Sequence, residues 1–177
     1  MQLLVPAARG RIESARVFAQ PLPVLLRGHT AAQRFLGFNA VRFVVGSDDD
    51  GEVLDAAVDQ LRSAGHEVEL LERDQWPDVA ARVANAVAGG EADQGLLFCW
   101  TGTGTAMAAN KVPGVRAALA WEPWIAEGAR RWNDANVLVM SLKRTEPETA
   151  RAIVDAWLSV AHPDEDEAEN IAKLDRQ

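Results

Sequence analysis

The sequence contains few of the residues that build disulfide frameworks or metal sites, and it lacks a long apolar run. Its 177 residues include one cysteine, Cys99, so no disulfide can form within the chain. The three histidines, His29, His66 and His162, form no cluster at the spacing of metal ligands. No apolar run approaches the roughly 20 residues of a membrane-spanning helix. These absences favour a cytoplasmic protein that uses no metal or other cofactor and does not bind a membrane.

Basic residues are scarce beyond the first part of the chain. Residues 1–42 carry six arginines and one acidic residue, whereas the remainder carries 12 basic and 25 acidic residues. An acidic body argues against binding to nucleic acid, which depends on clustered Lys and Arg. The pattern predicts three parts: a basic, poorly ordered extension over residues 1–39, a folded domain over residues 40–160 and an acidic tail over residues 161–177.

Apolar runs alternate with amphipathic segments along the predicted domain. Strands are predicted at residues 41–45, 68–71, 95–99, 115–120 and 137–140. Helices are predicted at residues 52–64, 77–88, 106–110, 123–132 and 147–160. This order predicts an α/β fold, a three-layer Rossmann-like domain with a five-stranded parallel sheet and helices on both faces. Ligands of such sheets bind at the carboxyl ends of the strands, here near residues 46–50, 99–105 and just after 120.

The segment after the third predicted strand has the features of a reactive site. Cys99 ends the strand, Gly102 and Gly104 allow a tight turn, and a helix of small residues follows. Backbone N–H groups in such a turn can bind an anion, and a thiol there can act as a base. On spacing alone, a buried cysteine beside an ordinary strand-to-helix turn is an equally good interpretation.

Several longer motifs point to one family. Residues 46–51 (GSDDDG), 86–93 (AVAGGEAD), 95–104 (GLLFCWTGTG), 108–117 (AANKVPGVRA), 132–138 (WNDANVL) and 153–158 (IVDAWL) occur in that order. Together they resemble the type B ribose-5-phosphate isomerase and galactose-6-phosphate isomerase family, over roughly residues 40–160. The resemblance implies an intramolecular oxidoreductase that interconverts aldose and ketose through an enediolate.

The resemblance also implies roles for individual residues. Cys99 matches the base that removes the C2 proton, and Thr101 matches the hydroxyl residue that helps to open the sugar ring. Asp48 and Asn133 match residues that hold sugar hydroxyls. The matching anion-binding loop consists of Gly102, Thr103, Gly104 and Thr105.

The chain departs from the family pattern at positions that would line the pocket. Trp132 stands where the family has a ring-opening histidine, and Asp49 replaces a second histidine. Trp76 replaces a tyrosine, Trp100 replaces a glycine, and Lys143 stands where an arginine is expected. Acidic residues 164–169 replace an arginine-rich stretch that grips phosphate. Indole cannot shuttle protons, and carboxylates repel phosphate, so ring opening and phosphate binding are both altered.

Two functions remain open at this stage. The first is an isomerase-like enzyme acting on a sugar or sugar-phosphate-like small molecule. The second is a non-catalytic or regulatory module that retains the pocket but not the proton transfer. Family members are dimers or tetramers with a shared pocket, which implies a homo-oligomer in which Trp132 and the C-terminal segment reach the partner's site.

Overall fold

The computed structural model describes residues 40–174, and the predicted extension over residues 1–39 lies outside this range. The strands are β1 (Arg42–Ser47), β2 (Glu67–Leu70), β3 (Gln94–Cys99), β4 (Ala117–Leu119) and β5 (Val137–Ser141). The helices are α2 (Glu52–Ser63), α3 (Trp76–Ala88), α4 (Thr103–Ala109), α5 (Pro123–Asn133), α6 (Pro147–Leu158) and α7 (Ala168–Leu174), with the 3-10 turn η1 (Glu165–Glu167) before α7. The strands and the first five of these helices occur in the predicted order, with boundaries shifted by up to three residues.

The five strands form one parallel sheet in the order β2-β1-β3-β5-β4. The chain leaves β1 toward β2 and then returns to place β3 on the other side of β1. The strand order therefore reverses between β1 and β3, where Ser47 lies beside Phe98. The predicted three-layer α/β fold is confirmed, and its switch point lies where the Cys99 loop begins.

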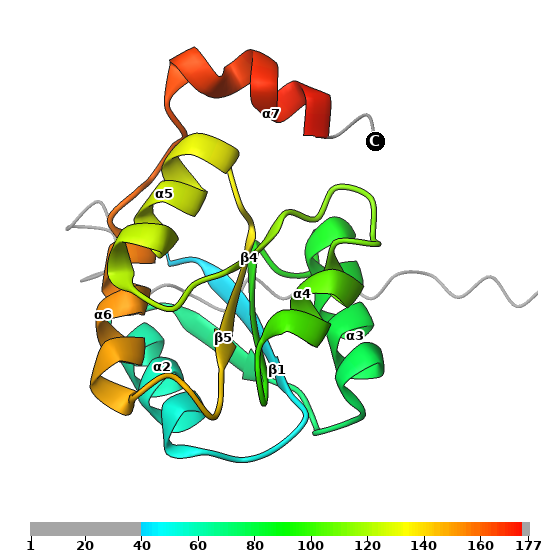
Figure 1. The fold of residues 1–177 in the computed structure, drawn as a ribbon, viewed down its shortest axis with the longest axis vertical. Helices are drawn as coiled ribbons and strands as arrows, with labels where there is room; N and C mark the ends of the chain where they lie inside the picture. The colour runs from blue at the N-terminus through cyan, green and yellow to red at the C-terminus, as the bar shows by residue number, and fades with distance from the viewer. Residues whose placement is uncertain (1–39, 175–177) are drawn as a thin grey trace, which may run out of the picture. The chain divides into compact units, whose positions relative to one another are not determined.

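Helices cover both faces of the sheet because side chains alternate along each strand. Phe43, Val45 and Phe98 face one layer, which contains α2, α5 and α6. Val44 and Leu97 face the other, which contains α3 and α4 (Figure 1). Both layers are fully apolar at their centres, so the strand ends are held in fixed positions.

The C-terminal region contains a short helix that the sequence analysis did not predict. Helix α7 has no buried residue, and Leu174 is 48% exposed. None of the helices between residues 40 and 174 combines the length and the apolar character of a bilayer-spanning segment.

Candidate functional site

A cavity of about 390 Å³ opens at the carboxyl ends of β1 and β3. It is lined by Asp48, Trp76, Cys99, Trp100, Thr101, Thr103 and Gly104. All seven are residues that the sequence analysis predicted to belong to the site. Six of them lie at or after the end of β1 or β3, which are neighbours, and Trp76 begins α3 after β2, the strand on the other side of β1. We call this cavity the Cys99 pocket.

The Cys99 thiol is surrounded by hydrogen-bond donors. The Gly102 N–H donates to Cys99 Sγ at 3.2 Å, and the Thr105 hydroxyl lies 3.5 Å from the same sulfur. Burial raises the pKa of the thiol, but the hydrogen bonds from Thr105, Gly102 and Thr101 together outweigh it. The pKa of Cys99 therefore lies below its ordinary value, which favours the thiolate that a proton-abstracting base requires.

Two residues predicted to bind substrate lie beneath the sulfur instead of on the pocket wall. Thr105 is fully buried, and its hydroxyl also lies 3.2 Å from the Gly102 carbonyl oxygen. Gly102 has a φ of 78°, and a Cβ there would lie 2.4 Å from Leu119 Cδ1. Only glycine fits this left-handed position, which turns the backbone N–H toward the thiol. The loop therefore supports the thiolate directly.

Replacing Thr105 with valine is expected to raise the pKa of the Cys99 thiol. The substitution keeps the buried volume but removes a donor that stabilises the charged form. Because Cys99 is the only cysteine, its ultraviolet thiolate absorbance can be followed across a pH titration. The midpoint should move to higher pH in Thr105→Val and stay in place in Thr103→Val, whose hydroxyl pairs with Thr101. Equal midpoints in all three proteins would contradict this account.

Asp48 lines the pocket, and one of its carboxyl oxygens makes no hydrogen bond with the described residues. Its Oδ1 atom is inaccessible to solvent and has no hydrogen-bond partner among the described residues. Burial is the main cause that raises the pKa of this carboxyl group, with Asp49 adding to the effect and Lys143 opposing it. A buried acceptor without a partner is costly, and a ligand hydroxyl that satisfied it would have to displace part of the pocket wall.

Asp49 and Lys143 both contact Trp100, which lines the pocket, and we call these three residues the rim cluster. The Trp100 indole N–H donates to Asp49 Oδ2 at 3.4 Å, and the Lys143 ammonium lies 5.0 Å from the centre of the Trp100 ring. The N–H of Asp50 and the Trp100 indole lower the pKa of the Asp49 carboxyl group. The three side chains come from the loops that follow β1, β3 and β5.

Ser141 ties two of these loops together, and the sequence analysis missed it. Its hydroxyl donates to the Trp100 carbonyl oxygen at 2.6 Å, and the Lys143 N–H donates to the same oxygen at 3.3 Å. The signal in the sequence was weak, because a serine at a strand end has many uses. The bond matters because it holds the loop after β5 against the residue that follows Cys99.

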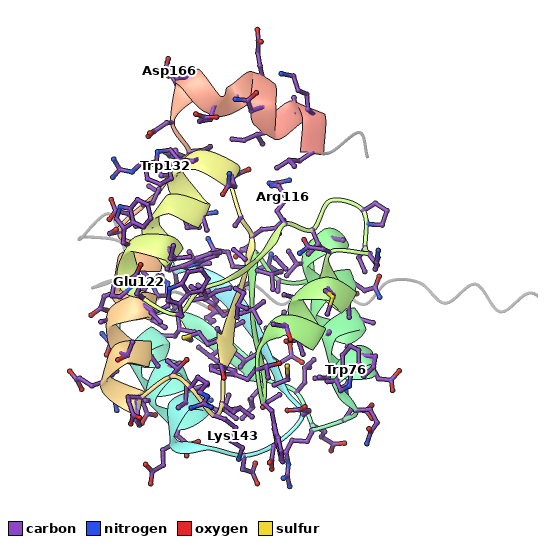
Figure 2. All side chains as sticks on the ribbon, in the orientation of Figure 1. Trp76, Arg116, Glu122, Trp132, Lys143 and Asp166 are labelled. Carbon is purple, nitrogen blue, oxygen red and sulfur yellow. The ribbon has the colours of Figure 1, made fainter. Side chains whose placement is uncertain are left out.

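Trp132 and Asn133 lie outside the Cys99 pocket. They line a separate cavity of about 840 Å³ with Arg116, Trp124 and Leu174. Figure 2 shows Trp132 and Arg116 at one end of the sheet and Trp76 and Lys143 at the other. The reason is geometric: α5 runs antiparallel to the strands, so its C-terminal residues lie at the amino end of β5. Within one chain, these two residues therefore do not meet Cys99.

Comparison with known proteins identifies the family of this chain. A sequence profile of the Ribose/Galactose Isomerase family matches residues 43–174, well over half of the chain. The chain belongs to the Ribose/Galactose Isomerase family. Among the members of this family, ribose-5-phosphate isomerase B of Escherichia coli is 47% identical over 91 residues, which are 51% of this chain and 61% of that protein. D-erythrulose-4-phosphate isomerase 2 of Mycolicibacterium smegmatis is 36% identical over 130 residues, which are 68% of this chain and 86% of that protein.

Solved structures in the Ribose/Galactose Isomerase family share the fold. The ribose 5-phosphate isomerase of Thermotoga maritima matches with a TM-score of 0.71 and 34% identity, over 78% of this chain and 100% of that one. Ribose-5-phosphate isomerase B of Clostridium thermocellum matches with a TM-score of 0.71 and 35% identity, over 76% of this chain and 95% of that one. The sequence alignments with the first curated relatives span 61%, 56% and 65% of those proteins.

Proposed function

We propose that the chain is an aldose–ketose isomerase that acts on a small sugar phosphate through an enediolate. The observation that carries the proposal is the Cys99 thiol, which lies at the base of a ligand-sized pocket and is held toward its thiolate form. The relatives that are isomerases of ribose 5-phosphate and D-erythrulose 4-phosphate support a substrate of this class.

The proposed reaction moves one proton from C2 to C1 and one from the oxygen on C2 to the oxygen on C1, and it needs no external oxidant. The Cys99 thiolate removes the proton from C2 of the open-chain aldose. The electron pair of the broken C–H bond forms a C1=C2 double bond, and the carbonyl oxygen on C1 gains negative charge. The Cys99 thiol then returns the proton to C1, while a proton leaves the oxygen on C2 and one is gained at the oxygen on C1. The aldehyde thereby becomes a ketone without a net change of oxidation state.

The groups around Cys99 fit the remaining requirements of this reaction. Asp48 lines the same pocket as Cys99, so its carboxyl group can accept a hydrogen bond from a sugar hydroxyl. Thr101 Oγ1 lies 2.7 Å from Thr103 Oγ1, so the pair offers hydroxyl groups beside the thiol. Thr103 and Gly104 open α4, where backbone N–H groups have no partner within the helix. These groups can stabilise the oxygen that becomes charged.

We further propose that a second copy of the chain completes the pocket. Trp132 and Asn133 match family site residues, yet they lie at the opposite end of the sheet from Cys99. The side chain of Trp132 is 39% exposed and that of neighbouring Trp124 is 61% exposed, and the two rings meet edge to face. A homodimer that places Asn133 of each chain at the other chain's Cys99 pocket would explain both the separation of Asn133 from Cys99 and the exposed tryptophans. The exposed Leu174 of α7 borders the same surface.

Exchange of the C2 proton with deuterated solvent tests the proposed function. Ribose 5-phosphate, allose 6-phosphate and a tetrose 4-phosphate would each be incubated with the protein beside the unphosphorylated sugars. Deuterium at C2 is expected for at least one phosphorylated sugar, together with the ketose product. Binding of these sugars without exchange at any pH would instead establish a non-catalytic sugar-binding module. The tryptophan at the family's ring-opening position favours that second candidate, because indole cannot transfer the proton.

A further inference from the structure

The rim cluster combines a cation with no carboxylate partner and an aromatic ring that holds it. Within residues 40–174, no carboxylate oxygen lies within 4.0 Å of the Lys143 ammonium, although the cluster contains Asp49. The ammonium lies instead 5.0 Å from the centre of the Trp100 ring. Resting on an indole face holds a lysine in place without pairing it with a carboxylate. Such a cation stays available to an incoming anion.

The backbone fixes this cation relative to the thiol. Cys99 and Trp100 are consecutive, and the Leu142 N–H donates to the Cys99 carbonyl oxygen at 2.9 Å. The Ser141 hydroxyl and the Lys143 N–H both donate to the Trp100 carbonyl oxygen. On the side chain, the indole N–H donates to Asp49 Oδ2. Trp100 is therefore held by the loop after β1 and by the loop after β5, while its ring lines the Cys99 pocket.

We propose that Trp100 is a positioning residue that determines substrate specificity. Its indole holds the Lys143 ammonium at the mouth of the Cys99 pocket, so that the phosphate of a sugar phosphate binds at a set distance from the thiol. Because Trp100, which is 59% exposed, also lines the pocket, its ring would limit the length of the sugar that enters, so that the pocket selects short substrates over hexose phosphates. The inference rests on the proposed function in one respect: the substrate must enter the Cys99 pocket.

Asp49 acts against phosphate and makes the balance within the rim cluster testable. Its carboxylate is close enough to Lys143 for each charge to influence the other, and it would repel a phosphate bound at the same mouth. Asparagine can still accept the indole hydrogen bond without the charge. Asp49→Asn is therefore expected to tighten the binding of inorganic phosphate severalfold, and weaker binding in this variant would contradict the assigned geometry.

A double-mutant cycle on ligand binding tests the proposal without a measurement of turnover. The dissociation constant of ribose 5-phosphate would be measured by calorimetry for the full-length wild-type chain, Trp100→Gly, Lys143→Met and the double variant. Loss of the cation–π contact is expected to weaken binding by roughly threefold to thirtyfold in Trp100→Gly, whereas the same change in the Lys143→Met background should have little effect. Trp100→Phe should recover most of the affinity, because a phenyl ring also attracts an ammonium.

Two controls separate positioning from general effects. Arg144→Met removes a neighbouring exposed charge that has no cation–π contact among residues 40–174, and it is expected to change the dissociation constant less than about twofold. Thermal unfolding of every variant identifies any loss of the fold. The inference would be overturned if Trp100→Gly weakened the binding of ribose 5-phosphate equally in the wild-type and Lys143→Met backgrounds. It would also be overturned if the wild-type chain bound neither ribose 5-phosphate nor inorganic phosphate.

Turnover adds the specificity test and separates this inference from the proposed function. In Trp100→Gly, kcat/KM for allose 6-phosphate relative to a tetrose 4-phosphate is expected to rise about tenfold, mainly through KM. An unchanged ratio would remove the claim on substrate length. Coupling between Trp100 and Lys143 in ligand binding, together with no exchange at C2 in the wild-type protein, would overturn the proposed isomerase activity and leave the role of Trp100 standing. Turnover without coupling between Trp100 and Lys143 would support the isomerase activity and overturn the role of Trp100.

Discussion

Cys99→Ala is expected to lose isomerisation and deuterium exchange at C2, with kcat lower by about a hundredfold to ten thousandfold. The sulfur is the group whose hydrogen bonds from Gly102 and Thr105 favour the charged, proton-accepting form. A methyl group cannot accept the proton. The loss should appear in kcat and leave sugar binding within a few fold, because the remaining pocket walls are unchanged.

The Cys99 experiment needs a second variant, because the side chain is 95% buried and tightly surrounded. Cys99→Ser keeps the size and the hydrogen-bonding capacity of the side chain but replaces the thiol with a far weaker acid. It should fold as the wild type does and be nearly as inactive as Cys99→Ala. Circular dichroism and thermal unfolding check the fold of both proteins. Exchange at C2 that persists in either folded variant would remove Cys99 as the base.

Mixing two inactive variants is expected to restore activity if the pocket is completed by a second copy. Asn133→Ala should lower kcat/KM by roughly a hundredfold, because a side chain that holds a sugar hydroxyl in position is lost. Asn133 is exposed, and its side chain makes no hydrogen bond within residues 40–174, so its loss should not disturb the fold of the single chain. Refolding Cys99→Ala together with Asn133→Ala in equal amounts would yield heterodimers with one intact pocket.

The expected recovery follows from simple statistics. Half of the dimers in a random mixture are heterodimers, and each has one intact pocket out of two, so about a quarter of the wild-type activity should return. A mixture of Cys99→Ala with Thr101→Ala is the matched control, because both changes fall in the same pocket and cannot complement. Recovery in the control, or none in the test mixture, would contradict a pocket shared between two chains.

The position of Trp132 shows where interpretation of the sequence alone reaches its limit. The motif match assigned Trp132 and Asn133 to the same site as Cys99, because a family motif indicates a shared function and does not give the positions of its residues in space. The topology then separates them, since a helix that follows one parallel strand ends at the amino edge of the next. Only the fold shows that the match implies two chains or two sites.

The rim cluster is a second case. The sequence analysis predicted Asp49, Trp100 and Lys143 as separate departures from a family pattern, with no reason to connect them. Their contact depends on β3 lying between β1 and β5, so that three loops meet at one mouth. Ser141 could not be predicted as their link, because its bond to the Trp100 carbonyl oxygen exists only when those loops are adjacent.

The sequence by itself determined the α/β class, the order of strands and helices, and the loop that holds Cys99. Each of these depends on local properties: alternating apolar residues, glycines that permit one backbone conformation, and a continuous motif. The tertiary structure decided which of these parts meet. It buried Thr105 beside the thiol, left Asp48 Oδ1 without a partner among residues 40–174 and placed Asn133 at the far end of the sheet, because distances between loops are set by strand order and helix packing.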